Sequence, residues 1–184
     1  MTTPTTPSTD AIVLVGPMGA GKTSIGRRVA KRLAVGFYDS DVAVVRAHGP
    51  IEDIFATAGE ERFRELEREA VRVGLETGGV VALGGGAVMD AATRADLAHH
   101  RVVLLTVTPE VVASRLADTT RPLLQTEDAL ARWSEIMEQR RPLYEAVADV
   151  VFDTSTGPLS DVVDAIVAWA RKNESTGMSG ATES

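Results

Sequence analysis

Hydrophobic residues follow two alternating patterns along the chain, short unbroken runs and longer stretches with helical spacing. Most of the unbroken runs are rich in valine, isoleucine and leucine, which is typical of parallel strands that are covered on both faces. The predicted strands are residues 11–15, 36–40, 80–83, 102–107 and 149–152.

Between these runs, apolar residues recur at the spacing of one helix face. After Lys22, for example, Ile25, Val29 and Leu33 form such a stripe. A later helix is expected to break or bend at Pro142. The alternation of strands and helices predicts a doubly wound α/β domain with right-handed crossovers. The other predicted helices are residues 60–75, 92–100, 109–118, 128–147 and 159–172.

Both ends of the chain lack this periodicity. Residues 1–10 are rich in threonine and proline and are predicted to be a disordered leader, and residues 173–184 a disordered tail. The part between them, residues 11–172, is expected to form a single domain. Residues 118–128, with the sequence DTTRPLLQTED, are predicted to be a mobile loop.

Composition narrows the class of partner. The chain has 184 residues and a net charge of −7, so we expect no nucleic-acid partner, and any anion must be held by a local group of arginines. The absence of cysteine excludes disulfides and thiolate metal sites. No apolar run approaches the roughly 20 residues of a membrane helix, and no signal peptide is recognisable. We therefore expect a soluble, cytoplasmic protein.

The stretch GPMGAGKT, from Gly16 to Thr23, follows the first predicted strand and leads into a helix. It matches the pattern GxxxxGK[ST], in which glycines let backbone amides close around phosphate oxygens at the positive end of a helix. Lys22 would reach the β- and γ-phosphates, and the Thr23 hydroxyl would help to hold Mg²⁺. The guanine-reading motif NKxD is absent, which favours ATP.

Further signatures follow in order after this motif. Together with GPMGAGKT they resemble the shikimate kinase family, from about residue 12 to residue 153. The resemblance implies a three-layer α/β/α P-loop kinase, a five-stranded parallel sheet in the order 2-3-1-4-5 and a mobile lid. It also implies a monomeric enzyme of aromatic amino acid biosynthesis that uses ATP and Mg²⁺ to phosphorylate the 3-hydroxyl of shikimate. The signatures are YDSD (38–41), FRELE (63–67), LGGGAV (83–88), DTTRPLL (118–124) and QRRPLY (139–144).

By this resemblance, a substrate-binding region covers about residues 39–68. Asp41 would bond the substrate hydroxyls and accept or orient the proton of the attacking one. The alternative for Asp41 is a cap on the following helix. Asp39 would contact Mg²⁺ through water. Arg64 and Arg140 would grip the shikimate carboxylate, because a guanidinium matches a carboxylate with two parallel hydrogen bonds.

Several of these assignments leave alternatives open. Arg64 could instead be a solvated partner within its own helix. Glu67 could orient an arginine or face solvent, and Arg141 could take the place of Arg140. The glycine triplet could be a flexible turn, or it could let the substrate ring approach. The residues of the triplet are Gly84, Gly85 and Gly86.

The resemblance also assigns the nucleotide contacts. Arg115 would stack on adenine, and Arg121 would swing over the γ-phosphate as the lid, residues 118–128, closes. The segment after the last strand, DTSTGPL, lacks the basic residue that family members often carry, so backbone groups of residues 154–158 are expected to substitute. The phosphate contacts fall on Gly19, Ala20, Gly21, Lys22, Thr23 and Ser24.

Two rival functions remain. One is a kinase of the same fold that acts on another small anion or on a sugar acid, such as gluconate. The other is an inactive relative that binds nucleotide and regulates a partner. Such a relative would have lost Lys22, Asp41 or the arginines, and the chain retains them all. Trp133 and Trp169 are interpreted as packing residues.

Overall fold

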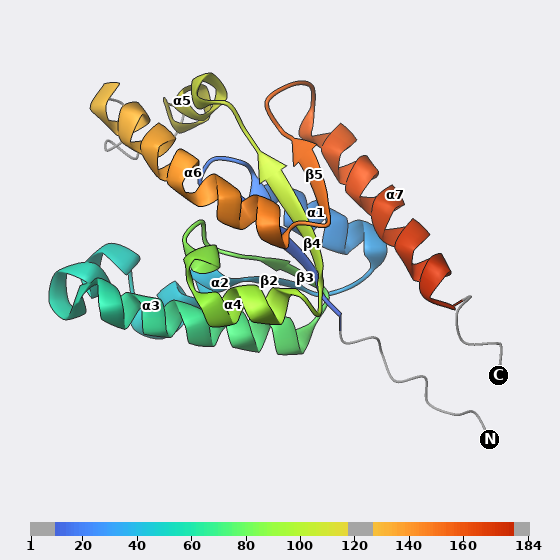
Figure 1. The fold of residues 1–184 in the computed structure, drawn as a ribbon, viewed down its shortest axis with the longest axis horizontal. Helices are drawn as coiled ribbons and strands as arrows, with labels where there is room; N and C mark the ends of the chain where they lie inside the picture. The colour runs from blue at the N-terminus through green and yellow to red at the C-terminus, as the bar shows by residue number, and fades with distance from the viewer. Residues whose placement is uncertain (1–9, 118–126, 179–184) are drawn as a thin grey trace.

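The computed structural model describes residues 10–117 and 127–178. In this part of the chain, five parallel strands form one sheet in the order β2-β3-β1-β4-β5 (Figure 1). This order confirms the prediction, and each strand lies within one residue of its predicted bounds. The strands are β1 (Ile12–Val15), β2 (Phe37–Asp39), β3 (Val80–Ala82), β4 (Arg101–Thr106) and β5 (Val150–Asp153).

The helices include one that was not predicted, α2, and others that are longer than expected. Helix α3 begins well before residue 60, and α7 continues past the predicted end of the domain at residue 172. The predicted lid with Arg121 lies outside the described residues, except that residues 127 and 128 begin α6. The helices are α1 (Lys22–Leu33), α2 (Ser40–His48), α3 (Ile51–Thr77), the short 3₁₀ helix η1 (Ala87–Met89), α4 (Ala91–Leu97), α5 (Pro109–Ala117), α6 (Glu127–Val147) and α7 (Leu159–Met178).

The helix does not break at Pro142, because α6 continues through it to Val147. A proline inside a helix removes one backbone donor and crowds the preceding turn. Here Pro142 is exposed, whereas Met137 and Tyr144 on the same helix are buried in the main core. Their packing holds the helix together on either side of the proline.

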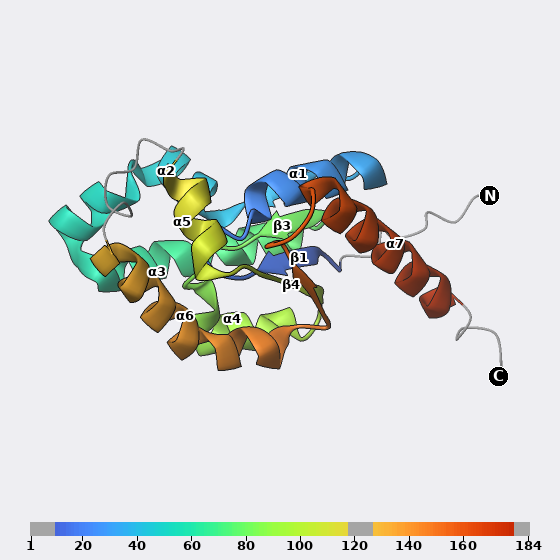
Figure 2. The same ribbon diagram turned by 90° about the horizontal axis from the view of Figure 1, so that it is seen from above.

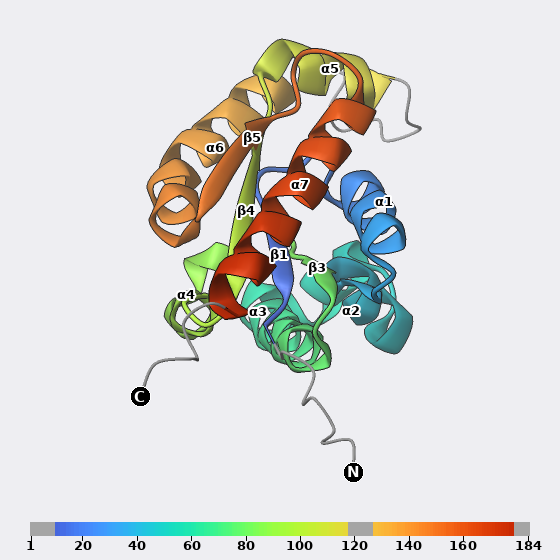
Figure 3. The same ribbon diagram turned by 90° about the vertical axis from the view of Figure 1, so that its right-hand side faces the viewer.

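Two neighbouring residues of β2 show which helices cover the two faces of the sheet. Side chains alternate across a strand, and the Phe37 ring contacts Gly26 of α1 while the Tyr38 ring contacts Gly74 of α3. Helices α1 and α3 therefore cover opposite faces of the sheet. Figure 2 shows α1 and α7 on one side of the sheet, with α4 and α6 on the other. Figure 3 shows the same division from the side of α7, which lies beside α1.

The apolar interior is divided into two clusters. The main core surrounds the central strands, where Val13 and Leu14 are fully buried. A smaller cluster lies between α2 and α3 and contains Val44, Ile54, Phe63 and Ala70. Within α3, the backbone leaves helical geometry at Gly59, with φ 83° and ψ 170°. None of the described helices is long and apolar enough to cross a membrane.

Candidate active site

The loop between β1 and α1 is tightly folded. Gly16 has a φ of 143°, and a Cβ there would overlap the carbonyl of Leu105 on β4. Gly21 is left-handed, with a φ of 88°, and forms the N-cap of α1. The first amides of α1 are thus at the loop, where an anion would meet the positive end of the helix dipole. The predicted order of strand, glycine-rich loop and helix is present.

Lys22 folds back over this loop. Its Nζ donates to the carbonyl oxygens of Gly16 at 2.8 Å and Pro17 at 2.9 Å. Burial lowers the pKa of Lys22 from 10.5 to about 8, although the charges of Asp41 and Asp39 raise it in part. Arg140 lowers it further. At neutral pH the lysine is still mostly protonated, and an arriving anion would favour its charged form further.

Binding of ATP should accordingly take up a proton at Lys22. Phosphate charge favours the protonated amine, so the pKa rises in the complex and the affinity for ATP falls as pH rises through about 8. Calorimetry of Mg-ADP binding at pH above 8, in two buffers of different ionisation enthalpy, measures this uptake. The Lys22→Met variant should show none. Equal proton uptake in that variant would contradict the assignment to Lys22.

Asp39, rather than Asp41, caps α2. Its Oδ1 accepts from the Val42 amide at 3.1 Å, and its Oδ2 accepts from the Thr23 hydroxyl at 2.7 Å. The alternative interpretation of Asp41 as the helix cap is therefore wrong. Asp41 lies in the first turn of α2 and lines a cavity that runs from the glycine-rich loop to the glycine triplet. We call this the main cavity.

Thr23 and Asp39 form a pair of oxygen donors that fits Mg²⁺. The ion prefers oxygen ligands and usually keeps several waters beside one or two carboxylates and substrate phosphates. Among the described residues no group of three histidine, aspartate or glutamate side chains could hold a metal. Asp39 is expected to contact the ion through water, and phosphate oxygens and further waters would complete the coordination.

The glycine triplet is the surface on which the predicted acceptor residues meet. A Cβ on Gly84 would overlap the Asp41 carboxylate and lie 3.0 Å from Glu67 Oε1. A Cβ on Gly86 would overlap the Arg64 guanidinium, and one on Gly85 would lie 3.6 Å from Arg140 Nη1. Gly84 and Gly86 thus make room for polar side chains, whereas a Cβ on Gly85 would be in ordinary contact with Arg140. The triplet is therefore more than a flexible turn.

Arg64 and Glu67 form a half-buried ion pair. Arg64 Nη1 donates to Glu67 Oε2 at 2.7 Å, and the Glu67 side chain is only 6% exposed. Burial raises the pKa of Glu67, while the hydrogen bond and charge of Arg64 oppose that rise. The solvent-facing alternative for Glu67 is wrong. Arg64 also pairs with Glu60 on its own helix at 3.4 Å, as its alternative predicted, and its guanidinium reaches the glycine triplet as well.

The two adjacent arginines of α6 point to different places. Arg140 lines the main cavity, whereas Arg141 lines a smaller hollow beside Thr106 and Asp153. The geometry thus favours Arg140 as the residue that faces the glycine triplet. Nearby, the Tyr144 hydroxyl donates to the Gly85 carbonyl at 2.5 Å. Burial raises the pKa of Tyr144 and keeps it a donor.

The main cavity has a volume of about 690 Å³ and runs from the loop to the glycine triplet. Ala20, Gly84 and Gly86 are buried behind its wall, and Arg64 reaches Gly86 from α3. The other predicted residues that the structure describes line it directly. These are Gly19, Gly21, Lys22, Thr23, Ser24, Asp39, Asp41, Gly85, Arg115 and Arg140.

Arg115, predicted to stack on adenine, is fixed at one end of the cavity. It donates to the carbonyl of Gly19 at 2.8 Å, to Thr154 Oγ1 at 3.1 Å and to the Thr154 carbonyl. Nothing in the sequence indicates that the Thr154 side chain is buried and takes part in these hydrogen bonds. From the sequence we expected only that backbone groups of residues 154–158 would contact the nucleotide.

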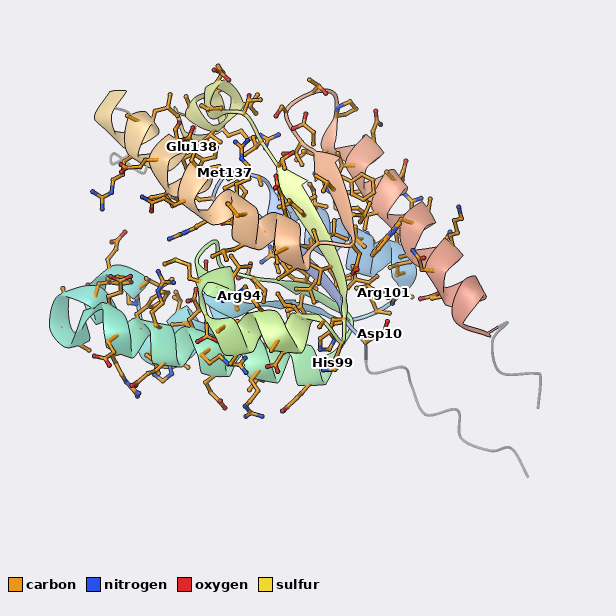
Figure 4. All side chains as sticks on the ribbon, viewed as in Figure 1. Asp10, Arg94, His99, Arg101, Met137 and Glu138 are labelled. Atoms are coloured by element: carbon orange, nitrogen blue, oxygen red, sulfur yellow. The ribbon has the colours of Figure 1, made fainter. Side chains whose placement is uncertain are left out.

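The histidines take no part in the cavity. His99 lies with Asp10 and Arg101 at the end of the sheet opposite α5 (Figure 4). His100 Nδ1 accepts a hydrogen bond from the Ala11 amide at 3.0 Å. This arrangement needs a neutral imidazole, and burial indeed lowers the pKa of His100.

Comparison with known proteins identifies the family. The family model for shikimate kinase matches residues 18–171. The chain belongs to the shikimate kinase family. The shikimate kinase of Streptomyces coelicolor is 47% identical over 161 residues, which cover 86% of this chain and 94% of that protein. As a member of this family, the protein phosphorylates shikimate with ATP and uses Mg²⁺.

Solved structures agree with the family. The shikimate kinase of Acinetobacter baumannii, in complex with shikimate, is 36% identical with a TM-score of 0.81 and covers 89% of this chain and 94% of that one. A gluconokinase from Sinorhizobium meliloti is 23% identical with a TM-score of 0.63, covers 92% of this chain and 97% of that one, and shares the fold. The rival assignment to gluconate therefore has fold similarity alone in its favour.

Proposed function

We propose that the main cavity transfers the γ-phosphoryl group of ATP to the 3-hydroxyl of shikimate and gives 3-phosphoshikimate. The observation that carries this proposal is the convergence of Asp41, Arg64 and Arg140 on the glycine triplet. The cavity wall beside the triplet continues to Lys22 and the glycine-rich loop. An acid with several hydroxyls would thus lie next to the terminal phosphate of a nucleotide.

The donor half of the cavity holds the triphosphate. Backbone amides from residue 19 onward face the phosphates, and Lys22 exchanges its bonds to Gly16 and Pro17 for bonds to phosphate oxygens. Thr23 and Asp39 would hold Mg²⁺, which when bound neutralises charge on the phosphates. We further propose that the lid, residues 118–128, closes over the nucleotide and brings Arg121 to the γ-phosphate.

The acceptor half orients shikimate. The guanidinium groups of Arg64 and Arg140 bind its carboxylate, and Glu67 fixes the orientation of Arg64. Asp41 accepts a hydrogen bond from the attacking hydroxyl and takes its proton as transfer proceeds. Phosphoryl transfer needs alignment and charge stabilisation more than covalent help, so one positioned carboxylate is sufficient.

The proposal is tested by an ADP-release assay with ATP, Mg²⁺ and a panel of acceptors. Shikimate should be turned over, while quinate, gluconate and nucleoside monophosphates should not release ADP above the rate without acceptor. Turnover of gluconate with none of shikimate would overturn the proposal and favour the sugar-acid kinase alternative.

Replacement of Arg64 by lysine should raise the KM for shikimate by about tenfold, because the loss of a bidentate, charge-assisted contact is expected to weaken binding by roughly 1.5 kcal/mol. The KM for ATP should stay unchanged. Steady-state kinetics with each substrate varied in turn measure both values. Arg62→Lys on the same helix is the matched control, since Arg62 pairs with Glu65 on the surface. An unchanged KM for shikimate would place Arg64 outside the acceptor site.

We also propose that the enzyme acts as a cytoplasmic monomer without a nucleic-acid partner. The monomer is what resemblance to the family implies, and the net charge of −7 opposes binding to nucleic acid. Light scattering coupled to gel filtration, with and without substrates, tests the monomer.

A further inference from the structure

Side chains hydrogen-bond the carbonyl oxygens of the glycine-rich loop from Gly16 to Ala20. Lys22 bonds the oxygens of Gly16 and Pro17. The next three oxygens accept hydrogen bonds from side chains far away in the sequence. These are Trp133 Nε1 to Met18 at 2.9 Å, Arg115 Nη1 to Gly19 at 2.8 Å and Thr154 Oγ1 to Ala20 at 3.0 Å. Thr154 Oγ1 lies at the same distance, 3.0 Å, from the Thr106 carbonyl, so its single hydrogen is shared between these two acceptors. We call Trp133, Arg115 and Thr154 the outer clasp.

The outer clasp determines where the loop amides point. A peptide group is planar and trans, so its carbonyl and the N–H of the next residue point in opposite directions. Because the Met18 and Ala20 oxygens are held from behind, the N–H groups of Gly19 and Gly21 are turned the other way. Gly19 and Gly21 line the main cavity. Their amides are therefore directed at the space assigned to the phosphates.

The donors of the clasp are themselves firmly held. Trp133 is 6% exposed and packs in the main core, and Thr154 is 1% exposed. The Thr154 amide donates to the carbonyl of Thr106 at 2.8 Å, which ties the threonine to β4. Trp133 is carried by α6, the helix that also carries Arg140 and Tyr144. The clasp thus connects the loop to α6, α5 and the end of β5.

We propose that Trp133 and Thr154 are positioning residues that preorganise the loop amides for the phosphates of ATP. Neither residue is among those that line the main cavity. Preorganised donors are effective because they need no rearrangement when charge appears. This inference rests on the proposed function only in that ATP phosphates bind the loop. It assigns to Trp133 more than the packing role that its helical position indicated.

The test is to remove each donor with little change in shape. Trp133→Phe removes the indole N–H, and Thr154→Val removes the hydroxyl. Each variant should raise the KM for ATP and the dissociation constant of Mg-ADP by about tenfold, as expected when a buried carbonyl loses its partner. The KM for shikimate should stay unchanged. Thr154→Ser, which keeps the hydroxyl, should restore wild-type values.

Matched controls separate this role from general loosening. Trp169→Phe on α7 and Thr93→Val on α4 alter a partly buried tryptophan and a buried threonine away from the loop, and should leave both KM values unchanged. Wild-type ATP affinity in both clasp variants overturns the proposal, as does an equal rise in KM for both substrates. If Thr154→Val does not fold, as judged by circular dichroism, Trp133→Phe decides alone. If the wild-type enzyme does not bind Mg-ADP, the proposed function fails instead.

Discussion

Replacement of Lys22 by alanine should lower kcat by about a thousandfold, as expected when a charged group that stabilises the transition state is lost. The lysine is the cation that lies over the loop, bonded to the Gly16 and Pro17 carbonyls. Negative charge shifts on the phosphates during transfer, and the interaction with Lys22 strengthens as it does. The coupled ADP-release assay measures the loss.

Lys31→Ala is the matched control for this result. Lys31 lies on the same helix as Lys22, exposed in its last turn. Its replacement should leave kcat unchanged. Near-normal turnover in Lys22→Ala would contradict the assignment of the loop to the phosphates.

Asp41→Asn should keep ATP binding and lower kcat by about a hundredfold to ten-thousandfold, the range for loss of a general base. Asparagine has the same shape, so it fits against Gly84 where the carboxylate now lies. It can still accept a hydrogen bond, but it cannot take the proton of the attacking hydroxyl. Steady-state kinetics and Mg-ADP calorimetry together separate the loss of turnover from a loss of binding.

Asp53→Asn, at an exposed position in the first turn of α3, is the control for Asp41→Asn. It should leave both turnover and nucleotide affinity unchanged. A change in ATP affinity alone in Asp41→Asn, with kcat intact, would show that Asp41 belongs to the donor half of the cavity.

The strands of the sheet could be predicted from the sequence because most of them are unbroken apolar runs. Unbroken runs such as residues 102–107 indicate burial on both faces, and the order of the strands followed from the family signatures. Helix α2 was missed because Val42 and Val45 are exposed, so the segment has no clear apolar stripe. Residues 51–59 were missed because Gly59 separates them from the strongly amphipathic part of α3.

The candidate site could be predicted only where its residues belong to a local sequence motif. The sequence showed that Asp39 and Asp41 belong to the site. It could not show which of them caps the helix and which faces the cavity, because that depends on the residue at which α2 begins. The same holds for Arg140 and Arg141. Trp133 bonds a carbonyl 115 residues away, and Thr154 bonds one 134 residues away. Hydrogen bonds at such separations depend on the packing of whole elements and have no local pattern.

The division of the interior into two apolar clusters has a consequence for the two halves of the site. The loop that receives ATP is built on the main core, whereas α2 and the first part of α3, which flank the acceptor, rest on the small cluster around Val44 and Phe63. Substitutions in that small cluster are therefore expected to shift Asp41 and Arg64, while the nucleotide half, the glycine triplet and Arg140 stay supported by the main core.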